Sequence, residues 1–180
     1  MKHPSIVLDQ CTPTLFVDYD GTLHAGHAYI DASGQITLDS GRPPFEYVPL
    51  LVEMLEPYPT VEIVLTTFWL RALHTSQVVS YLPQELARRV VDTTGEIKAR
   101  FSYVLNGAEK TDIITSYAYG KRLKNWLAID DSVHGAYHFG LKPGELLPNF
   151  LLLDSVRGIS DEHAQMRIRE WLARVHQEPV

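Results

Sequence analysis

Five short, mostly apolar runs, each ending at a polar or acidic residue, most constrain what this chain can fold into. The runs are near-continuous in apolar residues rather than alternating, which is typical of strands buried on both faces of a parallel sheet. In chain order they are 15–17 before Asp18, 61–65 before Thr66, 89–91 before Asp92, 126–129 before Asp130, and 150–153 before Asp154.

Helical periodicity fills the segments between these runs. The clearest case is 160–176, where an apolar stripe follows Ser160, a residue suited to cap a helix. Further helices are predicted over 45–55, 69–82 and 111–119. Strands that alternate with helices predict an α/β protein, namely a three-layer α/β/α Rossmann-like fold around a central parallel sheet.

Residues 23–44 interrupt this alternation. Two short stretches, 29–30 and 36–38, flank the turn-forming sequence DASG. We therefore expect a small β-hairpin that projects as a flap after the first strand. The length of 180 residues suits one domain, so we expect a single domain over 1–180.

Composition and charge argue against several classes of protein. The net charge of −6 and the pI of about 5.7 disfavour nonspecific nucleic-acid binding through bulk charge. The single cysteine, Cys11, cannot form an internal disulfide, which fits a reducing compartment. We find no signal peptide and no stretch near the roughly 20 apolar residues of a membrane helix. We expect a cytoplasmic protein without a membrane partner.

Acidic and hydroxyl side chains gather at the ends of the predicted strands. They are Asp18, Asp20, Thr66, Asp130 and Asp131. In open parallel sheets the carboxyl ends of the strands share one edge, where ligands bind. Two carboxylates ~4 Å apart repel by about 4 kcal/mol at an effective dielectric of about 20, so such a group calls for a cation. Mg²⁺ fits, because it takes a few carboxylate oxygens and fills its shell with water and substrate phosphate.

The segment D-Y-D-G-T at 18–22 has a spacing suited to such a site. Residues i and i+2 of an extended chain point the same way, so Asp18 and Asp20 are expected to face one cavity, with the Tyr19 carbonyl between them. Gly21 permits a sharp turn that offers backbone N–H groups to an anion, and the Thr22 hydroxyl is expected to brace the loop.

This segment resembles D-x-D-G-T, the first signature of the haloacid dehalogenase (HAD) superfamily of phosphohydrolases. Three further signatures follow in the order that the superfamily shows. Thr66 ends an apolar strand, Lys110 stands near the start of a helix, and the pair Asp130-Asp131 ends a later strand. The resemblance spans residues 14 to about 156, and cap domains of the kind found in the family have no room in the gaps between the signatures.

The resemblance implies a role for each matched residue. Asp18 would be the nucleophile and Asp20 the general acid and base. Thr66 and Lys110 would bind the substrate phosphate. The resemblance also implies a bound Mg²⁺ held by Asp18, Asp20 and Asp130, with Gly21, Thr22 and Asp131 in supporting positions. The presence of Asp20 favours a phosphatase, because dehalogenases of the superfamily generally lack it.

Several assignments stay open at this point. Thr67 competes with Thr66, and Lys121 and Lys124 compete with Lys110. The stretch T-T-F-W-L-R resembles an S-x-W-R pattern of HAD-like domains, some of them in RNA-repair proteins, but Leu70 departs from it. We interpret Arg71 as a helix-surface residue that could instead reach the site.

The four histidines near these signatures, His24, His27, His134 and His138, are interpreted as loop or helix-surface residues rather than metal ligands. His24 and His27 follow the first signature closely enough to border the site entrance.

We expect a Mg²⁺-dependent phosphatase that hydrolyses a phosphomonoester through an aspartyl-phosphate at an open site. The substrate would be a phosphorylated small molecule or the end of a macromolecule. Two alternatives are a nucleic-acid-end phosphatase domain and a HAD-like binding module without catalysis. A response-regulator receiver is disfavoured, because its acidic pair comes early and its phosphorylated aspartate ends a later strand. The oligomeric state is left open.

Overall fold

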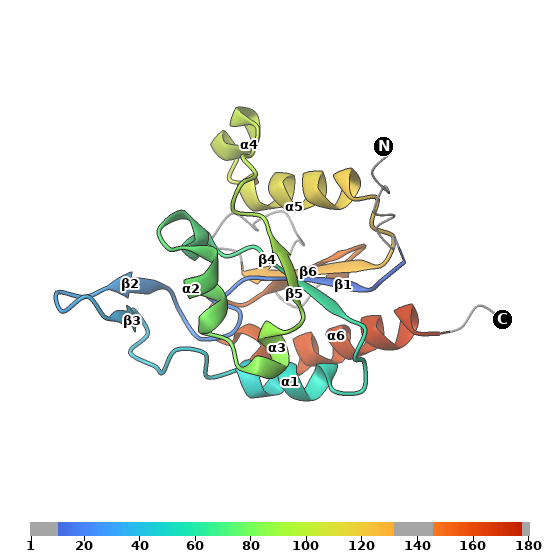
Figure 1. Ribbon diagram of the computed structural model, residues 1–180, viewed down its shortest axis with the longest axis horizontal. Helices are drawn as coiled ribbons and strands as arrows, with labels where there is room; N and C mark the ends of the chain where they lie inside the picture. The colour runs from blue at the N-terminus through green and yellow to red at the C-terminus, as the bar shows by residue number, and fades with distance from the viewer. Residues whose placement is uncertain (1–10, 132–145, 178–180) are drawn as a thin grey trace, which may run out of the picture.

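A six-stranded sheet forms the centre of the protein, which we describe from a computed structural model over residues 11–131 and 146–177 (Figure 1). The strand order is β5-β4-β1-β6-β8-β7. Five strands run parallel: β1 (Thr14–Val17), β4 (Glu62–Leu65), β5 (Val90–Thr93), β6 (Trp126–Asp131) and β8 (Phe150–Leu153). The short β7 (Leu146–Leu147) pairs antiparallel with β8 at one edge.

Helices cover both faces of the sheet, which confirms the predicted three-layer α/β fold (Figure 1). One face carries α1 (Val48–Leu55), α2 (Thr75–Ser80), α3 (Gln84–Ala87) and α6 (Glu162–Val175). The other carries α4 (Phe101–Leu105) and α5 (Glu109–Gly120). Two 3-10 turns, η1 (Phe68–Arg71) and η2 (Gly158–Ser160), complete the connections.

The strands are buried on both faces, as their continuous apolar runs predict. In β1, Leu15 and Val17 belong to the larger core beneath α1 and α6, whereas Phe16 points into the smaller core beneath α5. Phe16 packs edge-on against Trp126 with ring centroids 5.4 Å apart. Continuous apolar runs therefore reflect burial between two helical layers.

The β-hairpin is present as β2 (Ala28–Ile30) and β3 (Ile36–Leu38), paired antiparallel. It projects away from the body of the protein (Figure 1), and Tyr29 and Ile30 on it are exposed. The Asp31 side chain accepts hydrogen bonds from the backbone of the turn that joins the two strands. The described part of the chain contains no helix long and apolar enough to cross a membrane.

Four of the differences from the predicted boundaries can be traced to particular residues. Helix α1 begins at Val48 because Phe45 has a positive φ of 58°, which no α-helix accommodates. The predicted helix 69–82 is divided into η1 and α2, because His74 is extended and ends the first turn. The cap of α6 is Asp161 rather than Ser160; its carboxylate accepts the N–H groups of His163 and Ala164.

The fourth difference concerns the start of β5, which begins at Val90 and not at Arg89. The Arg89 guanidinium donates to the backbone oxygens of Leu55, Tyr58 and Val61. Arg89 thus satisfies carbonyls at the end of α1, which explains a charged residue in an otherwise apolar run. Three short elements, α3, α4 and β7, were not predicted, because each is too short to show a period.

Candidate active site

The register of the sheet brings the predicted residues to one edge. Val17 is aligned with Leu65 on one side and with Ile129 on the other. The residues that follow these three positions, Asp18, Thr66 and Asp130, therefore stand at the same level of three adjacent strands. The Thr66 N–H donates to the Val17 carbonyl at 3.0 Å, which ties the first two strand ends together.

Lys110 reaches the acids at this edge from α5, in the helical layer on the other face of the sheet from α1 and α6. It lies in the first turn of α5, and its ammonium donates to Asp130 Oδ2 at 2.8 Å and lies 3.3 Å from Asp18 Oδ1. All three side chains are at most 1% exposed. The Phe68 ring covers the ammonium, with Nζ 4.6 Å from the ring centroid. The helix thus delivers one buried cation between two buried carboxylates.

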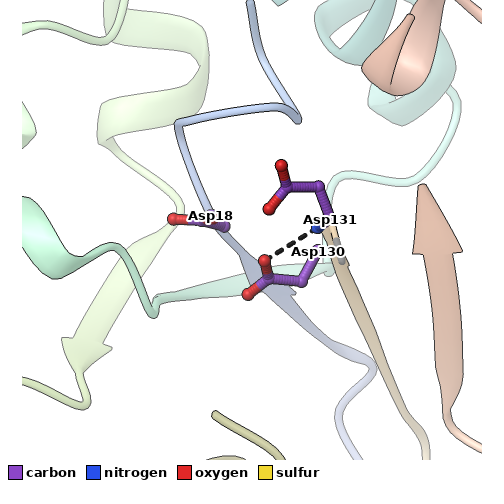
Figure 2. Close-up of side chains that lie close together, drawn as sticks. All are labelled: Asp18, Asp130 and Asp131. Atoms are coloured by element: carbon purple, nitrogen blue, oxygen red, sulfur yellow. Dashed lines mark hydrogen bonds between the residues drawn. The ribbon is translucent and has the colours of Figure 1, made fainter. Parts of the chain in front are cut away.

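Three carboxylates form a compact cluster beside this lysine (Figure 2). Asp18, Asp130 and Asp131 each offer one oxygen, and these oxygens lie within 4.8 Å of one another. The Asp131 N–H donates to Asp130 Oδ1 at 2.8 Å, which orients that carboxylate. Of the predicted ligands, Asp18 and Asp130 belong to this cluster. The carboxylate of Asp20 does not, and its assignment as a ligand stays a prediction.

The cluster fits a divalent cation. Its donors are all carboxylate oxygens, which suit Mg²⁺. The buried Asp18 Oδ2 has no hydrogen-bond partner among the described residues, and such an orphaned charged atom is costly unless something binds it. Among the described residues, the three clustered carboxylates lie beside one ammonium, that of Lys110, and a dication would balance the negative charge that remains.

The pKa shifts agree with this imbalance. Burial by itself lowers the pKa of Lys110, but the charges of Asp130 and Asp18 outweigh it, so the pKa is raised and the ammonium stays protonated. Burial, reinforced by the Asp18 charge, raises the pKa of Asp130 well above its ordinary value. At Asp130, burial and the charge of Asp18 thus outweigh the opposing effect of Lys110.

The loop after β1 turns sharply at Gly21. Gly21 has φ +66°, and a Cβ at this position would stand 2.1 Å from Asp131 Oδ2. The backbone of the loop thus passes directly against the carboxylate cluster. The Tyr19 carbonyl accepts the N–H groups of Thr22 and Leu23 at 3.1 and 2.9 Å. It serves the turn, which is a different role from the one expected between Asp18 and Asp20.

Asp20 is held on the other side of this loop. Its Oδ1 lies 2.8 Å from His24 Nε2 and accepts the Trp69 indole N–H at 3.1 Å. His24 lies in the loop after β1, as the sequence suggested, but its side chain is fully buried. Its other ring nitrogen, Nδ1, accepts the Phe45 backbone N–H at 3.2 Å. The spacing D-G-T-L-H was the available signal, but it does not show that the ring turns inward.

The two competing threonines have different surroundings. Thr67 Oγ1 accepts the Trp69 N–H and caps η1. Thr66 Oγ1 is buried and has no hydrogen-bond partner in the described part of the chain. Thr66 is therefore the hydroxyl that is available to a ligand. The Thr22 side chain is also buried in the loop, although its hydroxyl has no partner within the described ranges, so the expected bracing is not seen.

Two further predictions concern basic residues. Arg71 is exposed, pairs with Glu109, and lies over the outer face of the Phe68 ring at 3.6 Å, so it braces the ring that covers Lys110. Lys121 lies at the far end of α5, beside a pocket lined by Thr12 and Thr14 at the start of β1. It is therefore at the edge opposite the acids.

Among the remaining candidates, His27 lies beside the carboxylate cluster. His27 Nε2 lies 3.3 Å from Asp131 Oδ2, and its Nδ1 lies 3.3 Å from Asp39 Oδ2, so His27 bridges the cluster and the hairpin. Lys124 is exposed in the turn before β6, also at the opposite edge from the acids. His134 and His138 lie outside the residues that the structure describes.

Comparisons with known proteins complete the description of the site. A comparison with curated proteins gives no match. Among solved structures, a hypothetical protein from Xanthomonas campestris aligns with a TM-score of 0.44 and 15% identity over 97% of this chain and 90% of that one. Residues 14–164 match the family described as the HAD domain in Swiss Army Knife RNA repair proteins. This family supports phosphohydrolase-type chemistry at a general level. The match covers most of the chain and all four signatures, and the protein therefore belongs to this family of HAD domains.

Proposed function

We propose that the protein is a phosphatase that transfers the phosphoryl group of a phosphomonoester to Asp18 and then to water. The observation that carries this proposal is the buried contact of Lys110 with both Asp18 and Asp130, next to an Asp18 oxygen that has no partner among the described residues. A buried carboxylate with one uncommitted oxygen at the carboxyl edge of a parallel sheet is suited to nucleophilic attack.

The reaction would proceed in two displacements. In the first, Asp18 Oδ2 attacks phosphorus, the bond to the ester oxygen breaks, and protonated Asp20 gives its proton to the departing oxygen. In the second, water attacks the aspartyl-phosphate and gives its proton to Asp20. Inorganic phosphate leaves, and both aspartates return to their starting states.

The phosphate itself would be bound by the side chains of Lys110 and Thr66. The Lys110 ammonium would neutralise a phosphoryl oxygen, and the Thr66 hydroxyl, which is otherwise unpartnered within the described ranges, would donate to another. The N–H groups of Gly21 and Thr22 do not take the expected anion-binding role, because they donate within the loop to the carbonyls of Gly26 and Tyr19 at 3.0 and 3.1 Å.

A Mg²⁺ ion would be held by Asp18, Asp130 and Asp131, the three acids that cluster in the structure. When bound, it would supply positive charge that offsets the repulsion between the anionic substrate and the nucleophile. His27 contacts Asp131 from outside the cluster and would orient that carboxylate.

The description of the family also supports one class of substrate. Its description places these HAD domains in RNA repair proteins, which supports phosphorylated RNA ends as substrates over free small molecules. The net charge of −6 does not add to the affinity for RNA, so recognition would depend on the phosphorylated end rather than on the length of the strand.

Hydrolysis assays with Mg²⁺ test the proposal. The substrates are an aryl phosphate and RNA oligonucleotides phosphorylated at the 5′ or the 3′ end. Asp18→Asn should lower kcat at least about a thousandfold, because it removes the nucleophile. Asp92→Asn is the matched control, since Asp92 also stands near a strand end but at the exposed edge strand β5. Mass spectrometry after rapid quenching should find a transient phosphate on Asp18.

The alternative is a HAD-like domain that binds but does not catalyse. It predicts equal and negligible turnover for the wild type and Asp18→Asn, together with retained binding of phosphorylated ends. That pattern would refute the phosphatase proposal.

A further inference from the structure

Two side chains outside the four signatures, those of His24 and Trp69, contact Asp20. Two donors from different elements, the His24 imidazole and the Trp69 indole, converge on the same oxygen, Asp20 Oδ1. His24 is fully buried, Trp69 is 8% exposed and Asp20 is 6% exposed. We propose that His24 and Trp69 are positioning residues that hold Asp20 in the geometry it needs to transfer a proton; this role rests on the proposed phosphatase function.

The tautomer of His24 follows from its contacts. Nδ1 accepts the N–H of Phe45, so the ring carries its proton on Nε2 and donates it to Asp20. Trp69 has only a donor at its indole nitrogen. Both hydrogen bonds therefore run toward Asp20 Oδ1, which acts as the acceptor in each.

This arrangement assigns different tasks to the two oxygens of Asp20. An oxygen that already accepts two N–H donors is a poor site for a proton, because a proton there would displace at least one of the bonds. The exchangeable proton is therefore carried by Oδ2. In the first displacement it moves from Oδ2 to the leaving oxygen, and in the second a proton from the attacking water returns to Oδ2, so the number of protons balances.

The backbone that fixes His24 is strained. Phe45 has a φ of 58°, a left-handed conformation that is unfavourable for a bulky residue. Its ring is held by Tyr19 and Trp69, with centroids 4.9 and 5.6 Å away. The packing of these rings therefore maintains the conformation in which the Phe45 N–H reaches His24. Such strain is found where surrounding contacts over-determine the backbone, often at functional sites.

A purely structural network makes a different prediction from a positioning network. If the two donors only satisfied a buried acid, their loss would lower stability and would slow all substrates alike. If they position the general acid, their loss should matter most when the leaving oxygen needs a proton. Alkyl phosphates, including ribose phosphates, have poor leaving groups, whereas 2,4-dinitrophenyl phosphate has one that departs without a proton.

The test is first-turnover kinetics with these two substrates in saturating Mg²⁺. Trp69→Phe keeps an aromatic ring but removes the donor, and His24→Met removes the second donor at similar length. For each variant we expect about a tenfold loss or more in the rate of leaving-group release from an alkyl phosphate. We expect less than about a threefold loss with 2,4-dinitrophenyl phosphate, and an unchanged KM. His24→Gln, which retains an amide donor, should restore much of the rate.

The matched control is Trp126→Phe. Trp126 is also buried, but it starts β6 at the opposite end of the sheet and packs on Phe16 and Phe150. This variant should show the same modest loss of stability without any change in the ratio of the two rates. Equal losses on both substrates for Trp69→Phe, or no loss at all, would overturn the positioning role.

A measurement that does not depend on enzymatic activity distinguishes a failure of this inference from a failure of the proposed function. In ¹⁵N-edited NMR spectra, the His24 ring should be in the Nε2–H form, and Asp20→Asn should shift the Trp69 indole signal. An Nδ1–H tautomer would overturn the network whether or not the protein is active. An Nε2–H tautomer in a wild type that releases no phosphate from any substrate would refute the phosphatase function and reduce the network to a structural one.

Discussion

At the scale of single residues, the site depends on how closely the loop after β1 approaches the end of β6. The closest approach is at Gly21, where the backbone passes beside Asp131. This position has two requirements, a left-handed φ and the absence of a side chain. The requirements can be separated by comparing it with a glycine that has only the first of them.

Gly21→Ala should disrupt the carboxylate cluster. The φ of +66° costs an L-residue about 1 kcal/mol, and the new Cβ would stand 2.1 Å from Asp131 Oδ2, so the loop or the carboxylate must move. We expect a loss of about 2–4 kcal/mol in the free energy of unfolding and at least about a tenfold weaker affinity for Mg²⁺. Urea denaturation and calorimetric titration measure the two effects.

Gly34→Ala is the control for backbone strain. Gly34 stands in the hairpin turn with φ +82°, and no described atom lies within 4 Å of an added Cβ. This variant should lose only about 1 kcal/mol and should keep its Mg²⁺ affinity. If both glycine variants bind Mg²⁺ equally well, the approach of the loop to Asp131 does not matter for the metal.

Lys110→Met should be severely destabilising. The substitution keeps the length of the side chain but leaves Asp18 and Asp130 buried without their cation. Loss of one partner from a buried ion pair costs about 3–5 kcal/mol. We expect a loss of that size in urea unfolding at pH 7 without metal. Lys121→Met, at the far end of the same helix, should change stability by less than about 0.5 kcal/mol.

The signatures predicted which residues gather at the carboxyl edge of the sheet, but they did not predict that His24 is buried beside Asp20. Asp18, Thr66, Lys110 and Asp130 each end a strand or begin a helix, so their position along the chain determines where they lie. His24 could not be placed, because its burial depends on the strained Phe45 and on Trp69, which lies 45 residues further along the sequence.

At the scale of elements, the short helix α4 is attached to the molecule largely through one ion pair. Three of its apolar side chains, Phe101, Val104 and Leu105, are exposed, so packing contributes little. Instead, Asp112 on α5 accepts the Arg100 backbone N–H at 2.8 Å and its guanidinium at 2.7 Å. Asp112 is 3% exposed, so α4 depends on a buried acceptor in its neighbour.

This attachment should be sensitive to acid. The hydrogen bonds from Arg100 lower the pKa of Asp112 below its ordinary 3.8. The unfolded chain therefore binds a proton at higher pH than the folded chain, so the pair stabilises the protein fully above about pH 4 and loses its effect as the pH falls through the lowered pKa. The difference in unfolding free energy between wild type and Asp112→Asn should be constant from pH 7 to about pH 5 and shrink below pH 4.

Glu56→Gln provides the control for this pH dependence. Glu56 is exposed beyond α1, on the opposite face of the sheet, and its loss changes the net charge equally. The difference in unfolding free energy between Glu56→Gln and the wild type should be small at every pH. A difference for Asp112→Asn that does not change between pH 7 and pH 3 would show that the ion pair has no influence on acid stability.

Whether an element could be predicted depended on its length and burial. The five parallel strands and α6 were predicted because their burial shows in the sequence. The strands are continuous apolar runs, and the helix has one apolar stripe. The break between η1 and α2 could not be predicted, because His74 adopts an extended backbone there and no proline or glycine marks the position. The hairpin was predicted from the turn sequence DASG together with the two short stretches that flank it.

At the scale of the whole molecule, the fold gathers charge of one sign at the centre of its carboxyl edge. Within residues 11–131 and 146–177, three buried carboxylates lie beside one ammonium, and Asp18 has two like charges and one opposite charge as neighbours. Without a cation, the folded state thus holds repulsion that the unfolded chain relieves by separating the residues. The free energy of unfolding should therefore depend on whether the proposed metal site is occupied.

The final prediction tests this coupling by measuring stability with and without Mg²⁺. In EDTA, Asp18→Asn should be more stable than the wild type, on the order of 1–3 kcal/mol, because it removes two repulsions and one attraction. With Mg²⁺ at a hundred times its Kd, the wild type should gain about 2.7 kcal/mol, and Asp18→Asn should gain much less because it lacks one of the ligands. Glu56→Gln, which changes the charge equally but far from the cluster, should respond to Mg²⁺ as the wild type does. Equal gains for Asp18→Asn and the wild type would mean that the ion binds elsewhere, whereas a crossover in their stabilities between EDTA and Mg²⁺ requires that the cation and the repulsion meet at Asp18.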